Sequence, residues 1–156
     1  SKYPVLVEKY QLRTDSAGAG RQRGGLGAEM VVQALSPFTL TTRIDRMHCQ
    51  PWGLDGGHDA MGNSIGIRTN GEWQDDLPNA KVFGVRIKKG DAYVMRSGGG
   101  GGFGTPLERD PQLVKHDVHQ GYVSSEAARS SYGVVMLDGK VDVAATKKLR
   151  AQMNLA

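Results

Sequence analysis

A cluster of side chains that could bind a metal or act in catalysis occurs in one short stretch of the chain. Within fifteen residues the sequence places two imidazoles, one thiol and two carboxyls, on Asp45, His48, Cys49, His58 and Asp59. These groups are the usual ligands of zinc and related metals. Their spacing matches no metal-binding motif, however, and the stretch is rich in glycine. The sequence therefore predicts no metal site and favours an irregular loop with ordinary polar residues.

Cys49 is the candidate nucleophile of this stretch, and it is the only cysteine of the chain. A reactive thiolate needs a neighbouring base that lowers its pKa. His48 is adjacent in sequence, so in a strand the two side chains would point to opposite faces. The sequence thus identifies no complete catalytic set.

A second histidine pair lies near the C-terminus. His116 and His119 are three residues apart and would share one face of a helix. Two metal ligands can have this spacing, but Lys115, Asp117 and Gln120 surround the pair. Such polar neighbours favour a solvated helix face.

Five consecutive glycines, in "SGGGGGFGTPLERDP" from Ser97 to Pro111, allow three interpretations. A phosphate cradle needs a Lys and a Ser or Thr after the glycines, whereas Phe103 to Pro106 follow here, and no βαβ unit surrounds the run. A flexible tether would contain more polar residues. The remaining interpretation is close backbone packing, because glycine has no Cβ atom to keep segments apart. We expect this role for Gly98, Gly99, Gly100, Gly101, Gly102 and Gly104.

Composition sets wider limits on the class of protein. The chain has 156 residues, a formal charge of +4, 38% apolar residues and 22 glycines, which suits a loop-rich fold with a thin core. The basic residues are scattered, so we expect no nucleic-acid partner. No segment has the length and apolarity of a membrane span or a leader. Together with the lone cysteine, this predicts a cytoplasmic protein with no membrane association.

The patterns predict a mainly β fold followed by helices. Alternating or β-branched segments indicate about seven short antiparallel strands, arranged as a sandwich or barrel, with Asn70-Gly71 as a type I′ hairpin turn. Asp110, Ser124 and Asp142 are typical helix N-caps. We therefore predict a glycine-rich β domain over residues 1–109 and a helical appendage over residues 110–156, docked on it. We expect Trp52 and Trp73 to fill cores or interfaces, and Trp52 is the better interface candidate.

Four stretches of the chain occur in the order "YQLRTDSAGAGRQRGGLG", "PWGLDGG", "SGGGGGFGTPLERDPQLV" and "GYVSSEAARSSYGVV". Together they resemble the hydantoinase B/oxoprolinase family, and specifically its C-terminal part. The resemblance spans nearly the whole chain. It departs from the family pattern at Ala17 (usually Gly), Gln22 (usually aromatic) and Thr105 (usually Asp), and these changes leave the substrate open. Family members are usually much longer, so this chain is either a separate small subunit or a piece of a longer one.

The resemblance implies a barrel-like β fold beside glycine-rich, polyproline-II-like segments. It also implies membership of a hetero-oligomeric, ATP-dependent enzyme that opens cyclic amides such as hydantoins and oxoproline. The alternatives are a subunit of an acetone- or acetophenone-type ketone carboxylase, a ligase that activates ketone and bicarbonate, and a purely structural assembly subunit. In each case we expect the isolated chain to be inactive.

The resemblance also implies specific partners. We expect ATP and Mg to bind an actin/hexokinase-like subunit, a larger hydantoinase-B-like subunit to complete the assembly, and this chain to bind no cofactor. Its Arg21 and Arg23, in "GRQRGG", are the expected contacts for an anionic phosphate or carboxylate. The interpretation left open is that these arginines lie on the surface or fix the loop to a neighbouring subunit.

Overall fold

The structure is a computed structural model, which describes residues 3–75, 77 and 81–155. The chain forms two compact units. The first contains residues 1–13, 27–50 and 62–98, and the second contains residues 14–26, 51–61 and 99–156. Each unit therefore combines segments that are far apart in the sequence.

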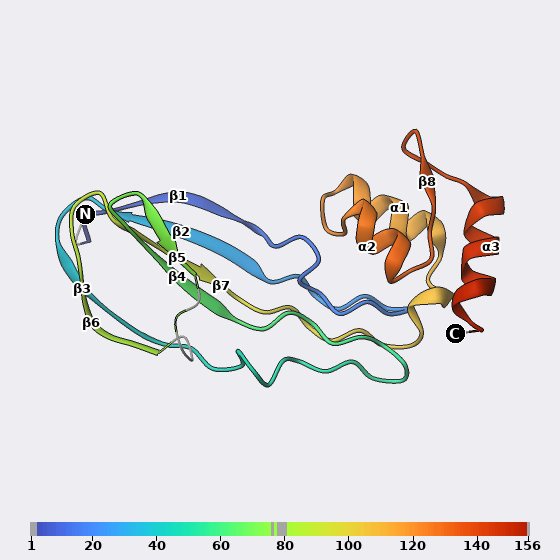
Figure 1. The fold of residues 1–156 in the computed structure, drawn as a ribbon, viewed down its shortest axis with the longest axis horizontal. Coiled ribbons are helices and arrows are strands. Elements are labelled where there is room, and N and C mark those ends of the chain that lie inside the picture. Colours follow the sequence, from blue (N-terminus) through green and yellow to red (C-terminus); the bar gives the residue numbers. More distant parts are fainter. Residues whose placement is uncertain (1–2, 76, 78–80, 156) are drawn as a thin grey trace. The chain divides into compact units, whose positions relative to one another are not determined.

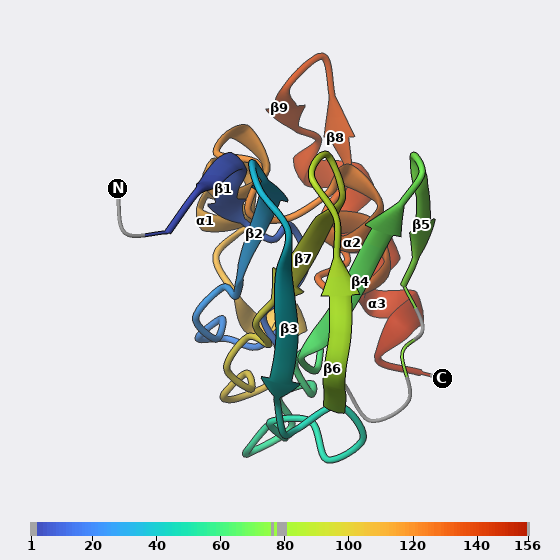
Figure 2. The same ribbon diagram turned by 90° about the vertical axis from the view of Figure 1, so that its left-hand side faces the viewer.

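The first unit is built from two antiparallel layers (Figures 1 and 2). Its five-stranded sheet has the order β1-β2-β7-β4-β5, and β3 pairs with β6 in a separate ribbon. The strands are β1 (Val5–Leu12), β2 (Ala28–Ala34), β3 (Phe38–Arg43), β4 (Ser64–Thr69), β5 (Glu72–Gln74), β6 (Lys81–Ile87) and β7 (Ala92–Arg96). The predicted mainly β, antiparallel fold is confirmed.

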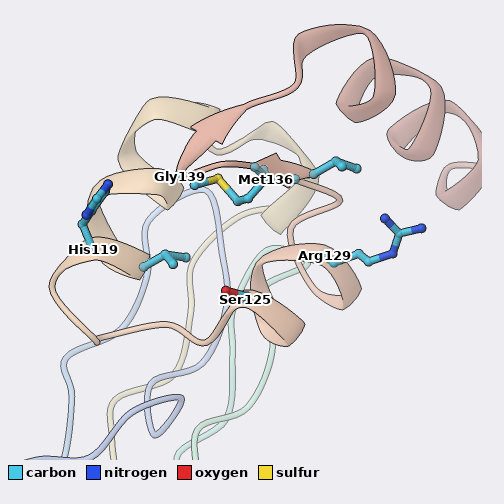
Figure 3. A pocket seen from close by; sticks show the side chains of 8 residues that line it. His119, Ser125, Arg129, Met136 and Gly139 are labelled. Atoms are coloured by element: carbon cyan, nitrogen blue, oxygen red, sulfur yellow. The ribbon is translucent and has the colours of Figure 1, made fainter.

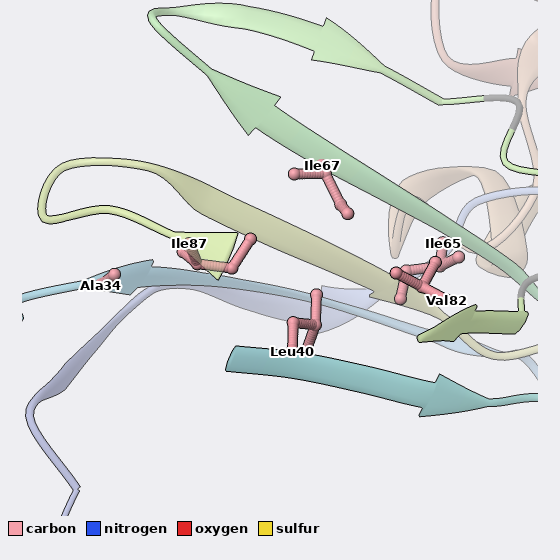
Figure 4. Packing of buried hydrophobic residues seen from close by; sticks show 6 residues of the cluster. All are labelled: Ala34, Leu40, Ile65, Ile67, Val82 and Ile87. Atoms are coloured by element: carbon pink, nitrogen blue, oxygen red, sulfur yellow. The ribbon is translucent and has the colours of Figure 1, made fainter. Parts of the chain in front are cut away.

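Aliphatic side chains join the two layers. The sheet supplies Ala34, Ile65 and Ile67, and the ribbon supplies Leu40, Val82 and Ile87 (Figure 4). Successive side chains of a strand point to opposite faces. One set therefore contacts the other layer, and the other set faces away from it. The β4–β5 connection is the predicted type I′ turn, because Asn70 and Gly71 both have positive φ, at 54° and 87°.

The second unit contains the helices and the glycine-rich segments. Its elements are a 3₁₀ turn (Pro106–Glu108), α1 (Pro111–His119), α2 (Ser125–Ser130), the hairpin β8 (Met136–Leu137) with β9 (Lys140–Val141), and α3 (Val143–Met153). The three predicted N-caps are confirmed. Asp110 accepts a hydrogen bond from the amide of Gln112, Ser124 from that of Ala127, and Asp142 from that of Ala145.

A small core holds the helical part together. Val114 of α1, Ala128 of α2 and Tyr132 and Val134 after α2 are almost completely buried and pack together with Ala19 of a glycine-rich segment. None of the helices in the described ranges has the length and apolarity that crossing a bilayer requires. The core therefore ties the segment around Ala19 to α1 and α2.

Candidate functional site

Three glycine-rich segments of the second unit lie against one another (Figure 1). Residues 99–104 bond both of the others, and the amide of His58 also donates directly to the carbonyl of Ala19. On one side Gly100 donates to the carbonyl of Gly25, and the amide of Gly18 donates to the carbonyl of Gly100. On the other side Gly102 donates to the carbonyl of His58 and accepts from the amide of Leu54. The segment of residues 99–104 runs antiparallel to the segment that contains Gln22 and parallel to the one that contains Leu54.

The backbones in this bundle are too close for side chains. A Cβ atom on Gly99, Gly101 or Gly102 would lie 2.1, 1.9 or 2.0 Å from the carbonyl oxygen of Ser16, Trp52 or Ala19, respectively. Gly100 is less constrained, with its nearest neighbour at 3.3 Å, and Gly104 has a φ of +71°. Gly98 belongs to the first unit and donates to the side chain of Asn63. Within the chain the run thus packs backbone against backbone, and its role toward another subunit stays a prediction.

The two tryptophans lie at the surface and not in a core. Trp52 is 68% exposed, with its backbone against Gly101, and Trp73 is 40% exposed beneath the guanidinium of Arg68. Neither tryptophan therefore fills a core of this chain, and an interface role for them, with Trp52 as the better candidate, stays a prediction.

Arg23 forms part of a buried ion cluster. Its Nε and Nη2 donate to the two carboxylate oxygens of Asp117, at 3.1 and 3.3 Å, and its plane lies over the ring of Tyr122. Asp117 is only 3% exposed and also accepts from Arg109, at 3.0 Å. Arg109 in turn donates to the carbonyl of Arg21. The cluster therefore fixes the glycine-rich loop to α1.

Arg21 has a different environment. Its side chain is half exposed, lies over the ring of Phe103, and approaches Glu108 at 3.6 Å, which is a loose surface pair. Of the two candidate anion-binding arginines, Arg21 is thus available to a ligand, whereas Arg23 is already held by a carboxylate. The sequence does not reveal Asp117 and Arg109 as partners, because the polar neighbours of Asp117 favour a solvated helix face.

A small polar cavity lies beside Arg23. Its volume is about 150 Å³, and its polar lining comes from Asp15, Arg23, His58, Asp59, Tyr122, Ser131 and Tyr132. Asp15 accepts from the amide of Ser124 and Asp59 from the amide of Gly53, so each carboxyl is held in place. The imidazole of His58 forms no hydrogen bond within the described part of the chain. The cavity could therefore hold water beside the imidazole of His58.

The cavity is walled on one side by the second unit's core. Tyr132 lines it and is 2% exposed, and burial raises the pKa of its hydroxyl to about 12. The cause is desolvation, which disfavours the phenolate. Tyr132 is therefore neutral at physiological pH and can donate a proton in a hydrogen bond but cannot act as a base.

The structure does not assemble the metal ligands suggested by the sequence. Among residues 3–75, 77 and 81–155 no three His, Cys, Asp or Glu side chains are grouped to hold a metal ion. Cys49 is exposed and lies in a bend. His58 and Asp59 belong to the second unit and line the small cavity, while His48 belongs to the first unit.

A larger cavity of about 470 Å³ lies between α1, α2 and the β8–β9 hairpin (Figure 3). His119, Ser125 and Arg129 supply its polar groups, and Val118, Val134 and Met136 are among its apolar residues. Figure 3 shows His119 and Arg129 on opposite sides of the cavity, so these two polar side chains do not converge on one point. His119 is exposed, as predicted for a solvated face.

Comparison with known proteins identifies the family. The family model described as Hydantoinase B/oxoprolinase matches residues 1–106. The putative D-/L-hydantoinase B-type subunit of a Pseudomonas species is 32% identical over 151 residues, which cover 96% of this chain and 26% of that protein.

Two solved structures share the fold. The nucleotide-free structure of acetone carboxylase superposes with a TM-score of 0.82 at 27% identity, over 97% of this chain and 25% of that one. The ATP-dependent caprolactamase of Pseudomonas jessenii superposes with a TM-score of 0.80 at 30% identity, over 96% and 27% of the two chains. The chain thus spans about a quarter of the length of each. It belongs to the hydantoinase B/oxoprolinase family.

Proposed function

We propose that this chain is part of a multi-subunit, ATP-dependent enzyme that opens cyclic amides. The observation that carries the proposal is the likeness to the ATP-dependent caprolactamase over 96% of the chain, at 30% identity. The hydantoinase relative is similar over the same share of the chain. Caprolactam and hydantoins are both cyclic amides, so these relatives favour one reaction class.

A ketone carboxylase is the second candidate. It is favoured by the TM-score of 0.82 to acetone carboxylase, which covers 97% of the chain. Both candidates use ATP to turn an unreactive carbonyl or enol oxygen into a leaving group. They differ in the next step, since the amidohydrolase admits water and the carboxylase admits a carboxyl donor.

In this proposal the chain does not bind the nucleotide. ATP and Mg²⁺ belong to a partner with an actin/hexokinase-like module, because the sequence of this chain contains no phosphate-binding motif. A larger hydantoinase-B-type polypeptide completes the assembly. The chain by itself is inactive in this proposal, since its sequence contains no complete catalytic set.

The two arginines then have separate tasks. Arg21 contacts the anionic activated intermediate, because its guanidinium is half exposed and its pair with Glu108 is loose. Arg23 positions the loop that carries Arg21, because its own guanidinium is bound to Asp117. The third candidate function, a purely structural subunit, would require Arg21 to be dispensable for turnover.

An isotope experiment on the purified assembly tests the proposal. Caprolactam, hydantoin and 5-oxoproline labelled with oxygen-18 at the amide carbonyl are supplied with ATP and Mg²⁺. If the amide oxygen is phosphorylated, one water adds to its carbon and the C–N bond breaks, with the nitrogen taking a proton and an acyl phosphate left behind. A second water then hydrolyses the acyl phosphate, so the label appears in inorganic phosphate and both carboxyl oxygens of the ring-opened acid come from water. The proposal fails if no cyclic amide stimulates ATP hydrolysis. Turnover that requires acetone or acetophenone together with bicarbonate would establish the carboxylase instead.

A further inference from the structure

The edge strand β1 carries an apolar stripe on one face. In its register with β2, Val5 lies opposite Ala34, Val7 opposite Val32, Tyr10 opposite Met30 and Leu12 opposite Ala28. Side chains of directly paired residues lie on the same face of a sheet. Ala34 belongs to the core between sheet and ribbon. Val5, Val7, Tyr10 and Leu12, which we call the β1 stripe, therefore lie on the core face of the sheet.

The β1 stripe is nevertheless open to solvent. The exposed fractions of Val5, Val7, Tyr10 and Leu12 are 37%, 52%, 74% and 50%. The ribbon covers the sheet only over its other strands. Figure 2 shows β1 at one margin, with β3 and β6 between it and β5. The second layer thus ends before it reaches β1.

The opposite face of the same strand carries Leu6, which lies opposite Gln33, and is otherwise polar. Lys9 lies opposite Val31 in the register with β2, and its ammonium group bonds the carboxylate of Glu29 at 2.7 Å. Gln11 lies opposite Glu29 on that face. An alternation of this kind is typical of a strand with one buried and one solvated face. In β1 the apolar face is the one left without a covering layer.

The length of the relatives indicates what covers it. This chain matches 25% of the acetone carboxylase chain and 27% of the caprolactamase chain, each with a TM-score of 0.80 or more. In those proteins about three quarters of one polypeptide lies outside the part with this fold. The two-stranded ribbon also has an open edge, and two strands are marginal as a layer without further pairing.

We propose that the β1 stripe is the docking surface for the larger hydantoinase-B-type polypeptide. An apolar element of that polypeptide packs over β1 beside the ribbon and extends the second layer across the sheet. The inference rests on the proposed function, which supplies this occupant. The contact with the larger polypeptide is thereby assigned to the apolar face of β1.

Variants on the two faces of β1 test the assignment. Tyr10→Asp places a charge in the stripe, and Gln11→Asp places the same charge on the opposite face of the same strand. The tagged chain is purified from the cells that make it, and the larger hydantoinase-B-type chain is identified by mass spectrometry and its affinity measured. We expect Tyr10→Asp to weaken the assembly at least about tenfold, because it would bury an unpaired charge. Gln11→Asp should stay within about twofold of wild type. Equal assembly of both variants would overturn the proposal.

Hydroxyl-radical labelling of the wild-type assembly gives an independent readout that does not depend on how a variant folds. Tyr10 should be labelled at least about tenfold more slowly in the native assembly than after unfolding in urea, because a covered ring is shielded from the solvent radical. If the assembly contains the larger chain but Tyr10 still reacts at nearly the unfolded rate, the docking surface is wrong. The proposed function is not contradicted by that result. A wild-type chain that purifies without any hydantoinase-B-type partner contradicts the proposed function and the docking surface together. Protection of Tyr10 by a second copy of this chain also overturns the proposal, because the occupant would be wrong.

Discussion

Arg23 binds both carboxylate oxygens of Asp117, a residue 94 positions further along the chain. Arg109 bonds one of the same oxygens from within the second unit, so two guanidinium groups share one buried carboxylate. This relationship makes the "GRQRGG" loop part of the fold, and it separates the roles of two arginines that the sequence alone presents as equivalent.

Loss of the Asp117 charge should destabilise the protein. We expect Asp117→Asn to lower the free energy of unfolding by about 3 kcal/mol, because two largely buried arginines lose their counter-ion. Urea unfolding at neutral pH measures the change. Glu108→Gln is the matched control, since its pair with Arg21 is exposed and should contribute less than about 0.5 kcal/mol. Equal stability of Asp117→Asn and wild type would show that the cluster is not a stabilising contact.

Close packing in the glycine bundle predicts a sharp difference between two glycines. Gly102→Ala would place a Cβ atom 2.0 Å from the carbonyl oxygen of Ala19, so we expect a loss of about 3 kcal/mol in stability. Gly25→Ala is the control, because a Cβ atom added there would meet no heavy atom within 4 Å. Thermal unfolding of both variants measures the difference. Similar melting temperatures would refute the close approach.

The buried hydroxyl group of Tyr132 should make the folded protein less stable in alkali. Its pKa is raised from 10.0 to about 12 by burial, so the folded state favours the neutral phenol. The stability that comes from the neutral phenol is fully present below pH 10 and is lost as the pH rises through 12. Between these two pH values the free energy of unfolding should fall by about 1.4 kcal/mol per pH unit. The free energy of unfolding of wild type and Tyr132→Phe, measured between pH 9 and pH 12, checks this. The phenylalanine variant should lose this part of the pH dependence, and parallel curves for the two proteins would contradict it.

Replacement of Arg21 should reduce turnover without changing the stability of the fold. In the active assembly, Arg21→Ala should reduce turnover by about tenfold to a hundredfold, the range expected for one hydrogen bond to a charged ligand group. Arg21→Lys should restore part of the activity, because the charge remains but the bidentate geometry is lost. The assembly and its melting temperature should not change. Unimpaired turnover of Arg21→Ala would favour the purely structural alternative.

Local chemistry makes much of the fold predictable from the sequence. Alternating residues such as those of Val5–Leu12 form strands, Asn70-Gly71 forms its hairpin turn, and Asp110, Ser124 and Asp142 cap helices. Each of these depends on neighbours within a few residues. The absence of side chains in the glycine run likewise predicts close backbone contact, although it does not identify the partners.

Features that depend on distant residues cannot be predicted in this way. Asp117 has polar neighbours in sequence, which favour a solvated face, but it is buried because Arg23 and Arg109 reach it from other segments. The small cavity likewise combines Asp15, His58 and Tyr122 from three separate stretches. Trp52 is exposed although it is large and apolar, which a local pattern does not indicate.

The order of segments in the glycine bundle has a consequence for how the protein is made. Residues 14–26 and 51–61 are joined through hydrogen bonds to residues 99–104, which the ribosome adds last of the three. Contacts between segments so far apart slow folding, because the intervening chain must be closed into loops first. The nascent chain therefore holds two glycine-rich segments without their shared partner until that third segment has been synthesised. This interval is when chaperones would be expected to engage it.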